Sequence, residues 1–211
     1  ELFQKCSEKS VNRKYAAQAA YWKAETLIQM DKSDEALVAF KEFMDKPKSN
    51  EIEEFAYAYY GQGYIHYQRK DYALGATYFN EFTSKVSSGR YVEAIVHDAH
   101  LRLGDCYLME RNLESSVRAY AYVSGKKGRD ADYALYQSAI IYGLLERSEE
   151  KITTIKRLLA EYPRSTYLLD AYNDIASEYM LLKQYDQAEK YYTIILEKFP
   201  GTQLTRKAYS T

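Results

Sequence analysis

Two histidines offer the first candidate chemistry in this sequence. His97 and His100 stand three residues apart, with Asp98 and Cys106 nearby in the chain, and residues three apart share one face of an α-helix. Two such ligands could chelate zinc, but a zinc site needs three or four ligands and polar groups that orient them. We therefore predict no metal site and no cofactor, and interpret both histidines as partly buried, hydrogen-bonded side chains.

Other residues with catalytic potential also lack the neighbouring groups that a catalytic motif requires. Gly61-Gln62-Gly63 has no third glycine and follows no predicted strand, so it indicates a close helix contact rather than a phosphate loop. Cys106 lies among Leu103, Tyr107 and Leu108, a setting typical of a buried, unreactive thiol. No nucleophile-elbow, zinc-protease, Walker or kinase signature is present. We predict that the protein is not an enzyme, has no catalytic residues and takes no small-molecule substrate.

Charge and composition set further bounds. The 211 residues carry 29 Lys and Arg against 30 Asp and Glu, which argues against a nucleic-acid binder or a protein held on anionic lipid. Stretches without a formal charge, such as Tyr133 to Leu145, are too short to span a membrane. With 24 Tyr and 7 Phe but only 3 Pro and 9 Gly, the chain offers few places to turn. This composition predicts long helices joined by short loops.

Pairs of small residues twelve positions apart recur along the chain. The pairs are Ala24 and Ala36, Gly63 and Gly75, Gly104 and Ser116, and Ala176 and Ala188; in the remaining unit Ala139 faces Lys151. Successive units start 39, 41, 35 and 37 residues apart. Regular spacing of this size is the signature of a repeat protein built from helix pairs.

Large side chains keep the same offsets in every unit. Four residues after the second small position stand Phe40, Phe79, Tyr120, Ile155 and Tyr192, and three residues further stand Phe43, Phe82, Val123, Leu158 and Ile195. This spacing places one apolar stripe on the second helix of each unit. Pro47, Pro163 and Pro200 follow these stripes and are expected to end the second helices.

This pattern resembles the tetratricopeptide repeat (TPR) family, most closely in the stretch from Ala171 to Pro200. The resemblance implies an all-α fold, a right-handed α-solenoid of about five helix-turn-helix repeats that forms one domain over residues 1–211. The expected repeats are 17–50, 56–90, 97–128, 132–165 and 169–202. The fourth is weaker, because Lys151 must snorkel or splay its helix pair. The third closes in a loose turn at Ser124 to Gly128, and Ser87-Ser88-Gly89 is the clearest lengthened link.

The ends of the chain suggest a piece of a longer protein. Glu1 to Lys9 resembles the tail of an earlier helix, and Gln203 to Tyr209 could begin another. The endings Glu161-Tyr162-Pro163-Arg164-Ser165 and Lys198-Phe199-Pro200-Gly201-Thr202 are similar to those of bacterial envelope TPR proteins of the outer-membrane assembly and Tol-Pal-associated types. This resemblance favours a periplasmic location, with the cytoplasm as the alternative.

The resemblance also implies a concave face lined by first helices. Residues six and three before, and one and four after, the first small position would point there. In the second repeat, 56–90, all four are tyrosines, and a clustered set of rigid aromatic rings is typical of a binding hot spot. The candidate partner-binding residues are Tyr21, Tyr57, Tyr60, Tyr64, Tyr67, Asp98, Asp105, Tyr133 and Tyr136. Packing between long helices is the alternative interpretation of each ring.

Two functions follow from this pattern. The first is a non-catalytic scaffold that captures a peptide or helix of a partner protein in the tyrosine-rich groove. The alternative is a structural spacer or oligomerisation segment of a larger repeat protein. The chaperone-tail clamp of the family is disfavoured, because the groove positions contain no Lys or Arg to hold a carboxylate.

Overall fold

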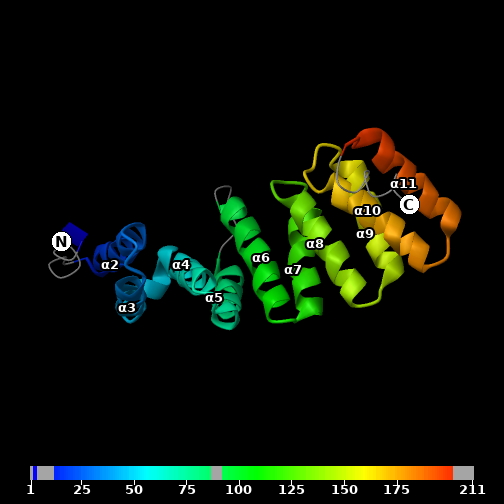
Figure 1. Ribbon diagram of the computed structural model, residues 1–211. Helices are drawn as coiled ribbons and strands as arrows, with labels where there is room; N and C mark the ends of the chain where they lie inside the picture. The colour runs from blue at the N-terminus through cyan, green and yellow to red at the C-terminus, as the bar shows by residue number, and fades with distance from the viewer. Residues whose placement is uncertain (1, 4–11, 87–91, 202–211) are drawn as a thin grey trace. The chain divides into compact units, whose positions relative to one another are not determined.

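The computed structural model describes residues 2–3, 12–86 and 92–201, and its elements there are all helical (Figure 1). The predicted all-α fold is therefore confirmed. Three expectations lie outside the described residues: the helix tail at Glu1 to Lys9 apart from residues 2–3, the link Ser87-Ser88-Gly89, and a helix start at Gln203 to Tyr209. Cys6 lies outside them as well.

The chain forms two compact units, Glu1–Ser116 and Val117–Thr211. The elements of the first unit are α2 (Arg13–Gln29), α3 (Ser33–Met44), the 3-10 helix η1 (Ser49–Glu51), α4 (Glu54–Gln68), α5 (Tyr72–Lys85) and α6 (Val92–Met109). Helix α7 (Leu113–Gly125) contains the boundary, and the second unit continues with α8 (Ala131–Leu144), α9 (Ser148–Glu161), α10 (Leu168–Leu181) and α11 (Tyr185–Lys198). Helices α2 and α3, α4 and α5, α8 and α9, and α10 and α11 pack as pairs, as the small-residue spacing predicts. That residues 1–211 act as a single domain stays a prediction.

Small residues on first helices admit large rings from second helices. A Cβ built on Gly63 in α4 would come within 2.9 Å of the Phe79 ring in α5, and one on Gly61 within 2.7 Å of the Phe40 ring in α3. Both rings are fully buried. Burying such a ring contributes about 1.5–3 kcal/mol, so these glycines are required by close packing and not by a turn.

The turn inside each helix pair repeats one backbone device. The residue seven positions after each first small residue has a left-handed backbone, with φ between 57° and 63°: Asp31, Lys70, Arg111, Glu146 and Lys183. The next backbone N–H reaches back to close the helix, as from Lys32 to the carbonyl of Leu27. This Schellman closure usually uses glycine. Its recurrence on non-glycine residues explains how so few glycines serve so many turns.

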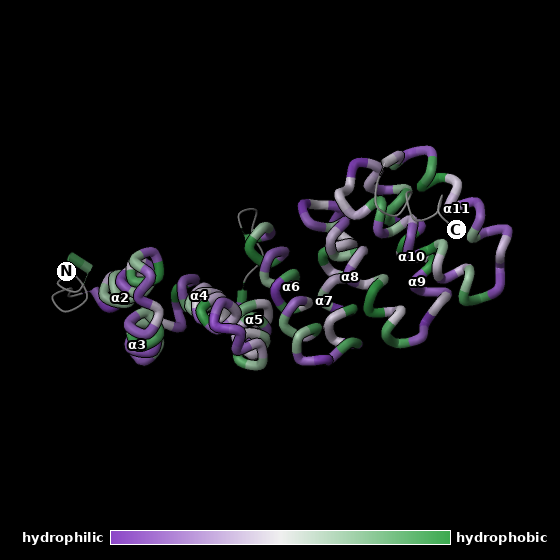
Figure 2. Tube along the Cα trace, in the orientation of Figure 1, coloured by the Kyte–Doolittle hydropathy of each residue, from purple (hydrophilic) through white to green (hydrophobic). Residues whose placement is uncertain are grey.

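Second helices end where the prolines predict. Helices α3, α9 and α11 stop at Met44, Glu161 and Lys198, two or three residues before Pro47, Pro163 and Pro200. The helices carry both polar and apolar residues (Figure 2). Across the described ranges, helices with the length and apolar character of a membrane span are absent.

Candidate functional site

The most distinctive cluster of the first unit joins α4 to α6. We define the tyrosine face as Tyr57, Tyr60, Tyr64 and Tyr67 of α4 together with Asp98, Arg102 and Asp105 of α6. Spacings of three and four residues put the four tyrosines in one stripe along α4. Each tyrosine is half-buried, so part of each ring remains open to solvent.

The inner edges of these rings pack on the second helix of the same repeat. The Tyr60 ring lies 5.1 Å from that of Phe82 between centroids, and the Tyr64 ring stands edge-on to Phe79 at 5.5 Å. Edge-to-face pairs of this kind contribute about 0.5–1.5 kcal/mol beyond the area they bury. The phenylalanines of α5 therefore fix the tilt of the tyrosine rings.

Carboxylates of α6 fix the outer ends of the same rings. The hydroxyl of Tyr60 donates to Asp98 Oδ2 at 2.8 Å, and the hydroxyl of Tyr64 donates to the same oxygen. Tyr67 donates to Asp105 Oδ2 at 3.1 Å. Hydrogen bonds to a charged acceptor contribute about 1.5–3 kcal/mol each. Asp98 and Asp105, expected as groove residues, thus act on the tyrosines.

Arg102 completes this network and was missed by the sequence analysis. Its Nη1 lies 2.8 Å from Asp105 Oδ2, its Nε lies 3.5 Å from Asp98 Oδ1, and its guanidinium stacks 5.4 Å from the centre of the Tyr67 ring. Arg102 stands two residues before Gly104, a position outside the four assumed to face the groove, but its long side chain reaches the face. The pairing of tyrosines with carboxylates did have a signal in the sequence. Tyr60 and Asp98 are 38 residues apart, and so are Tyr67 and Asp105.

The electrostatics keep every hydroxyl of the network protonated at neutral pH. Burial, and then the hydrogen bond to Asp98, raise the pKa of Tyr64 to about 12. The pKa of Tyr60 is raised further by burial and by the negative charge of Asp98, and that of Tyr67 is raised by burial and Asp105. The tyrosines therefore act as donors throughout the physiological pH range.

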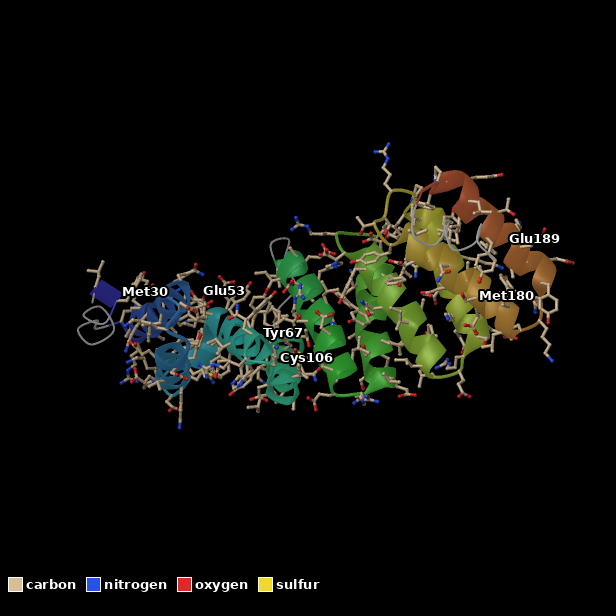
Figure 3. All side chains as sticks on the ribbon, viewed as in Figure 1. Met30, Glu53, Tyr67, Cys106, Met180 and Glu189 are labelled. Atoms are coloured by element: carbon tan, nitrogen blue, oxygen red, sulfur yellow. The ribbon has the colours of Figure 1, made fainter. Side chains whose placement is uncertain are left out.

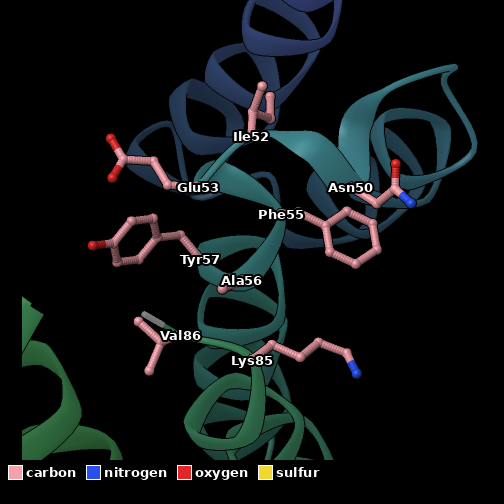
Figure 4. Close-up of a pocket in the computed structure, with 8 residues that line it drawn as sticks. All are labelled: Asn50, Ile52, Glu53, Phe55, Ala56, Tyr57, Lys85 and Val86. Carbon is pink, nitrogen blue, oxygen red and sulfur yellow. The ribbon is translucent and has the colours of Figure 1, made fainter. Parts of the chain in front are cut away.

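Tyr57 differs from the other three tyrosines. Among the described residues its hydroxyl has no hydrogen-bond partner, although burial and the carboxylates of Glu53 and Glu54 raise its pKa. The residue lines an open pocket of about 360 Å³ with Ile52, Phe55 and Val86 (Figure 4). Figure 4 shows Tyr57 and Glu53 pointing to one side of α4 and Phe55 to the other. Tyr57 is thus the tyrosine of this face with a hydroxyl to offer a ligand.

Tyr21 lies in the core of the first repeat. It is 6% exposed, and its ring packs edge-on against Phe43 at 5.6 Å. Burial and the neighbouring Glu25 raise its pKa. Little of its surface is open to a partner, because the small residues of α2 let the ring sink between the helices.

Tyr133 and Tyr136 belong to a smaller aromatic cluster in the second unit. The Tyr136 ring stacks on Tyr167 at 5.0 Å, and Tyr133 packs edge-on against Tyr120 at 6.1 Å. Burial and the negative charge of Asp174 raise the pKa of Tyr136 to about 12. Both side chains are half-buried, so this cluster combines packing with an open surface.

The histidine pair and the cysteine of α6 have ordinary structural environments. Burial, and then the neighbouring His97, lower the pKa of His100 to about 4, so its imidazole is neutral at pH 7. Cys106 is fully buried, and burial raises its thiol pKa to about 12 (Figure 3). Throughout the described part of the chain, no three His, Cys, Asp or Glu side chains are grouped as metal ligands.

Several solved structures share the fold of this chain. The chain is 16% identical to YrrB, a TPR protein described as having an unusual peptide-binding site, with a TM-score of 0.72 over 100% of this chain and 99% of that chain. It is 15% identical to MamA 41-end from Desulfovibrio magneticus RS-1, with a TM-score of 0.60 over 88% and 97% of the two chains. Apo RapI gives 12% identity and a TM-score of 0.67 over 94% of this chain and 58% of that chain. At such identities the likeness establishes the fold. No curated protein sequence matches the chain.

Family models agree with the helix pairs. One model described as tetratricopeptide repeat matches residues 21–89, and a second with the same description matches residues 133–165 and 175–202. Together they cover more than half of the chain, including the weak fourth repeat. The protein belongs to the tetratricopeptide repeat family, whose helix pairs stack into an α-solenoid and generally serve as scaffolds for protein interactions.

Proposed function

We propose that this protein is a non-catalytic scaffold that binds an extended or helical segment of a partner protein on the tyrosine face. The observation that carries the proposal is the fixed geometry of that face. Tyr60, Tyr64 and Tyr67 are held at the ring by α5 and at the hydroxyl by α6. Rings ordered before binding lose little entropy when a partner arrives.

The half-exposed state of the rings supports a binding role over pure packing. Tyrosines that only fill space between helices would be buried like Phe79 and Phe82 beside them. Contiguous exposed aromatic surface usually marks an interaction site. Tyr57 adds a hydroxyl that can exchange a hydrogen bond with the backbone of a bound segment.

The charges of the face favour some partners over others. Arg102, the cation of the tyrosine face, is already paired with Asp98 and Asp105. A partner carboxylate placed there would lose water and gain no free cation. We therefore propose basic or apolar-aromatic segments as ligands rather than acidic C-terminal tails, nucleic acid or small-molecule substrates.

Two further observations support a role in binding. TPR proteins generally bind peptides or other proteins, and YrrB, which shares this fold, has a peptide-binding site. The second aromatic cluster at Tyr133 and Tyr136 gives the second unit a surface of the same kind. These side chains are a secondary part of the proposal.

A bacterial envelope remains the proposed setting. Its support is the resemblance of the Glu-Tyr-Pro and Lys-Phe-Pro endings after α9 and α11 to those of envelope TPR proteins. Fractionation of the source cells, followed by immunodetection of the protein, would test it: recovery in the periplasmic or envelope fraction is expected, and recovery with cytosolic markers would overturn it.

The proposed function can be tested by affinity capture from a lysate of the source organism, with cross-linking and mass spectrometry. We expect a partner whose cross-links map to α4 and α6, and whose recovery falls when Tyr57 and Tyr67 are both replaced by Ala. Tyr67→Ala leaves the pairing of Arg102 with Asp105 in place, so the fold should survive. Capture of copies of this chain alone, with concentration-dependent sedimentation, would instead favour the structural spacer or oligomerisation segment.

A further inference from the structure

The fourth repeat departs from the others at two residues that lie against each other. Lys151 occupies a position that is Ala, Gly or Ser in the other repeats. Gly143, four residues after Ala139, occupies the position that is Ile28, Tyr67, Leu108 and Met180 elsewhere. A Cβ built on Gly143 would lie 3.4 Å from both Cδ and Nζ of Lys151. The missing side chain therefore leaves the space through which Lys151 extends.

The ammonium of Lys151 ends in a buried polar contact with the next repeat. Its Nζ lies 2.7 Å from Glu178 Oε2 in α10, and the hydroxyl of Ser148 donates to Glu178 Oε1 at 2.5 Å. Glu178 is 6% exposed. Burial opposes its charge, but the bonds from Lys151 and Ser148 bring its pKa below the usual value. Both oxygens of Glu178 thus have donors. The ion pair of Lys151 with Glu178 is therefore held in place, and we call it the floor of the pocket described next.

An open pocket of about 640 Å³ lies over this floor, within the second unit. Ile140, Leu144 and Leu181 give it apolar walls, and Leu144 and Leu181 are 62% and 73% exposed. Exposed apolar side chains gathered at one cavity, rimmed by polar residues, mark an interaction site. The pocket combines an apolar rim with a charged interior.

The interior has more negative than positive charge. Glu146, Asp174 and Glu178 line the pocket, and Lys151 is the one basic residue among the lining side chains. Asp174 accepts a hydrogen bond from the neutral hydroxyl of Tyr136 and forms no ion pair with any described residue. Burial raises the pKa of Asp174, and the positive charge of Lys151, which is already bonded to Glu178, offsets this only in part.

We propose that this pocket receives a lysine or arginine side chain of a partner segment, with an apolar neighbour of that residue resting on Leu144 and Leu181. The cation would pair with Asp174, whose carboxylate has lone pairs left, while Glu178 stays bound to Lys151. Charge complementarity and the exposed leucines select this occupant over an acidic or a fully apolar one. This pocket is independent of the tyrosine face, which lies in the other unit.

The test uses the full chain and two blocked tripeptides, acetyl-Leu-Arg-Leu-amide and the same peptide with citrulline, a neutral isostere of arginine. We expect the arginine peptide to shift the methyl NMR signals of Ile140, Leu144 and Leu181 saturably, and the citrulline peptide to bind at least about fivefold more weakly, because charge-assisted hydrogen bonds are lost. Equal binding of the two peptides, or shifts confined to other methyl groups, would overturn the proposal.

Variants in the second unit sharpen this result. Asp174→Asn keeps an oxygen that can accept from Tyr136, and Leu181→Ser changes an exposed side chain, so both should fold. Each should weaken the arginine peptide, Asp174→Asn by at least about fivefold. Glu189→Gln removes an exposed carboxylate of α11 outside the pocket (Figure 3) and should bind as the parent does. Unchanged affinity of Asp174→Asn, or an equal loss in Glu189→Gln, would contradict a specific contact.

Discussion

The tyrosine face and the fourth-repeat pocket occupy comparable places, each between the first helices of neighbouring repeats. In the tyrosine face, Asp98 and Asp105 receive hydrogen bonds from three tyrosines and ion pairs from Arg102. In the pocket, Glu178 is fully bonded by Lys151 and Ser148, but Asp174 has a neutral tyrosine as its hydrogen-bond donor. Both carboxylates of the tyrosine face are paired with Arg102, which leaves one negative charge uncompensated, whereas the three carboxylates of the pocket share Lys151 alone, and Asp174 forms no ion pair with any described residue.

One repeat register yields two different surfaces in this protein. Large side chains at the groove positions of α4 make a filled aromatic wall. A glycine at the corresponding position of α8, with a lysine on α9, makes a cavity. The helix pairs are the same, so the surface chemistry is set by few residues that do not change the fold.

Removing the partner of the buried lysine should have the largest effect on stability. Glu178→Ala leaves the ammonium of Lys151 and the hydroxyl of Ser148 unpaired in a site where the Lys151 side chain is only 15% exposed. We expect a loss of about 3 kcal/mol in the free energy of unfolding, measured by urea denaturation. The double variant Lys151→Ala, Glu178→Gln restores the small residue of the other repeats and should recover most of this loss. A Glu178→Ala variant as stable as the parent would show that the ion pair of Lys151 with Glu178 does not hold the two helices together.

Adding one methyl group to a glycine should have opposite effects in the two regions. In Gly63→Ala the new Cβ meets the buried Phe79 ring at 2.9 Å, and overpacking should cost about 1–3 kcal/mol. In Gly143→Ala it meets the flexible Lys151 side chain at 3.4 Å, and the better helix propensity of alanine should stabilise by up to about 1 kcal/mol. Urea denaturation of both variants measures the difference, and the same sign in both would contradict it.

Mild acid should weaken the first unit and spare the second. His100 has a pKa lowered from 6.5 to about 4, so the unfolded chain binds this proton more tightly and stability falls as the pH drops. Solvent screens part of this shift, so between pH 7 and pH 5 the loss should be about 1 kcal/mol. The raised pKa of Asp174 acts in the opposite direction, because the folded state then binds its proton more tightly than the unfolded chain.

Hydrogen exchange followed by mass spectrometry can separate the two units. Once exchange rates are corrected for their intrinsic pH dependence, α6 should lose protection at pH 5 while α10 keeps it. His100→Gln should remove the loss in α6. A parallel decrease in both helices, or one that persists in His100→Gln, would argue against this assignment.

Glycine at the left-handed turn positions should give the smallest effect, and the same one in both units. Lys70→Gly and Lys183→Gly relieve a left-handed backbone at φ 63° and 57°. Each should raise the free energy of unfolding by about 0.5–1 kcal/mol in urea denaturation. A gain in one unit and a loss in the other would mean that the two turns are not equivalent.

The sequence predicted the fold through packing constraints that recur at fixed offsets. Gly63 and Gly75 are small because Phe79 and Cys106 lie against them, and Pro47, Pro163 and Pro200 end helices wherever they occur. Periodicity reveals such local requirements. The closing turns follow the same register, although lysine, arginine and acidic residues stand where such turns usually have glycine.

The sites could be predicted only in part. The tyrosine stripe was visible, because it depends on the spacing within one helix. Arg102 and the pairing of each tyrosine with α6 were not, because they depend on how far side chains reach between repeats. The pocket could be predicted only from Gly143 and Lys151 together. Gly143 alone predicts an empty space, and Lys151 alone predicts a clash between the helices.

The central claim is that the tyrosine face binds partner segments, and a matched pair of double variants tests it most directly. Peptides selected from a random library on the parent chain would be titrated against Tyr57→Ala/Tyr67→Ala and against Tyr15→Ala/Tyr185→Ala. The second pair removes two rings that are 65% and 58% exposed outside the face. We predict at least about a tenfold loss of affinity in the first variant and a change of less than about twofold in the second. Equal affinity in both variants would contradict the account.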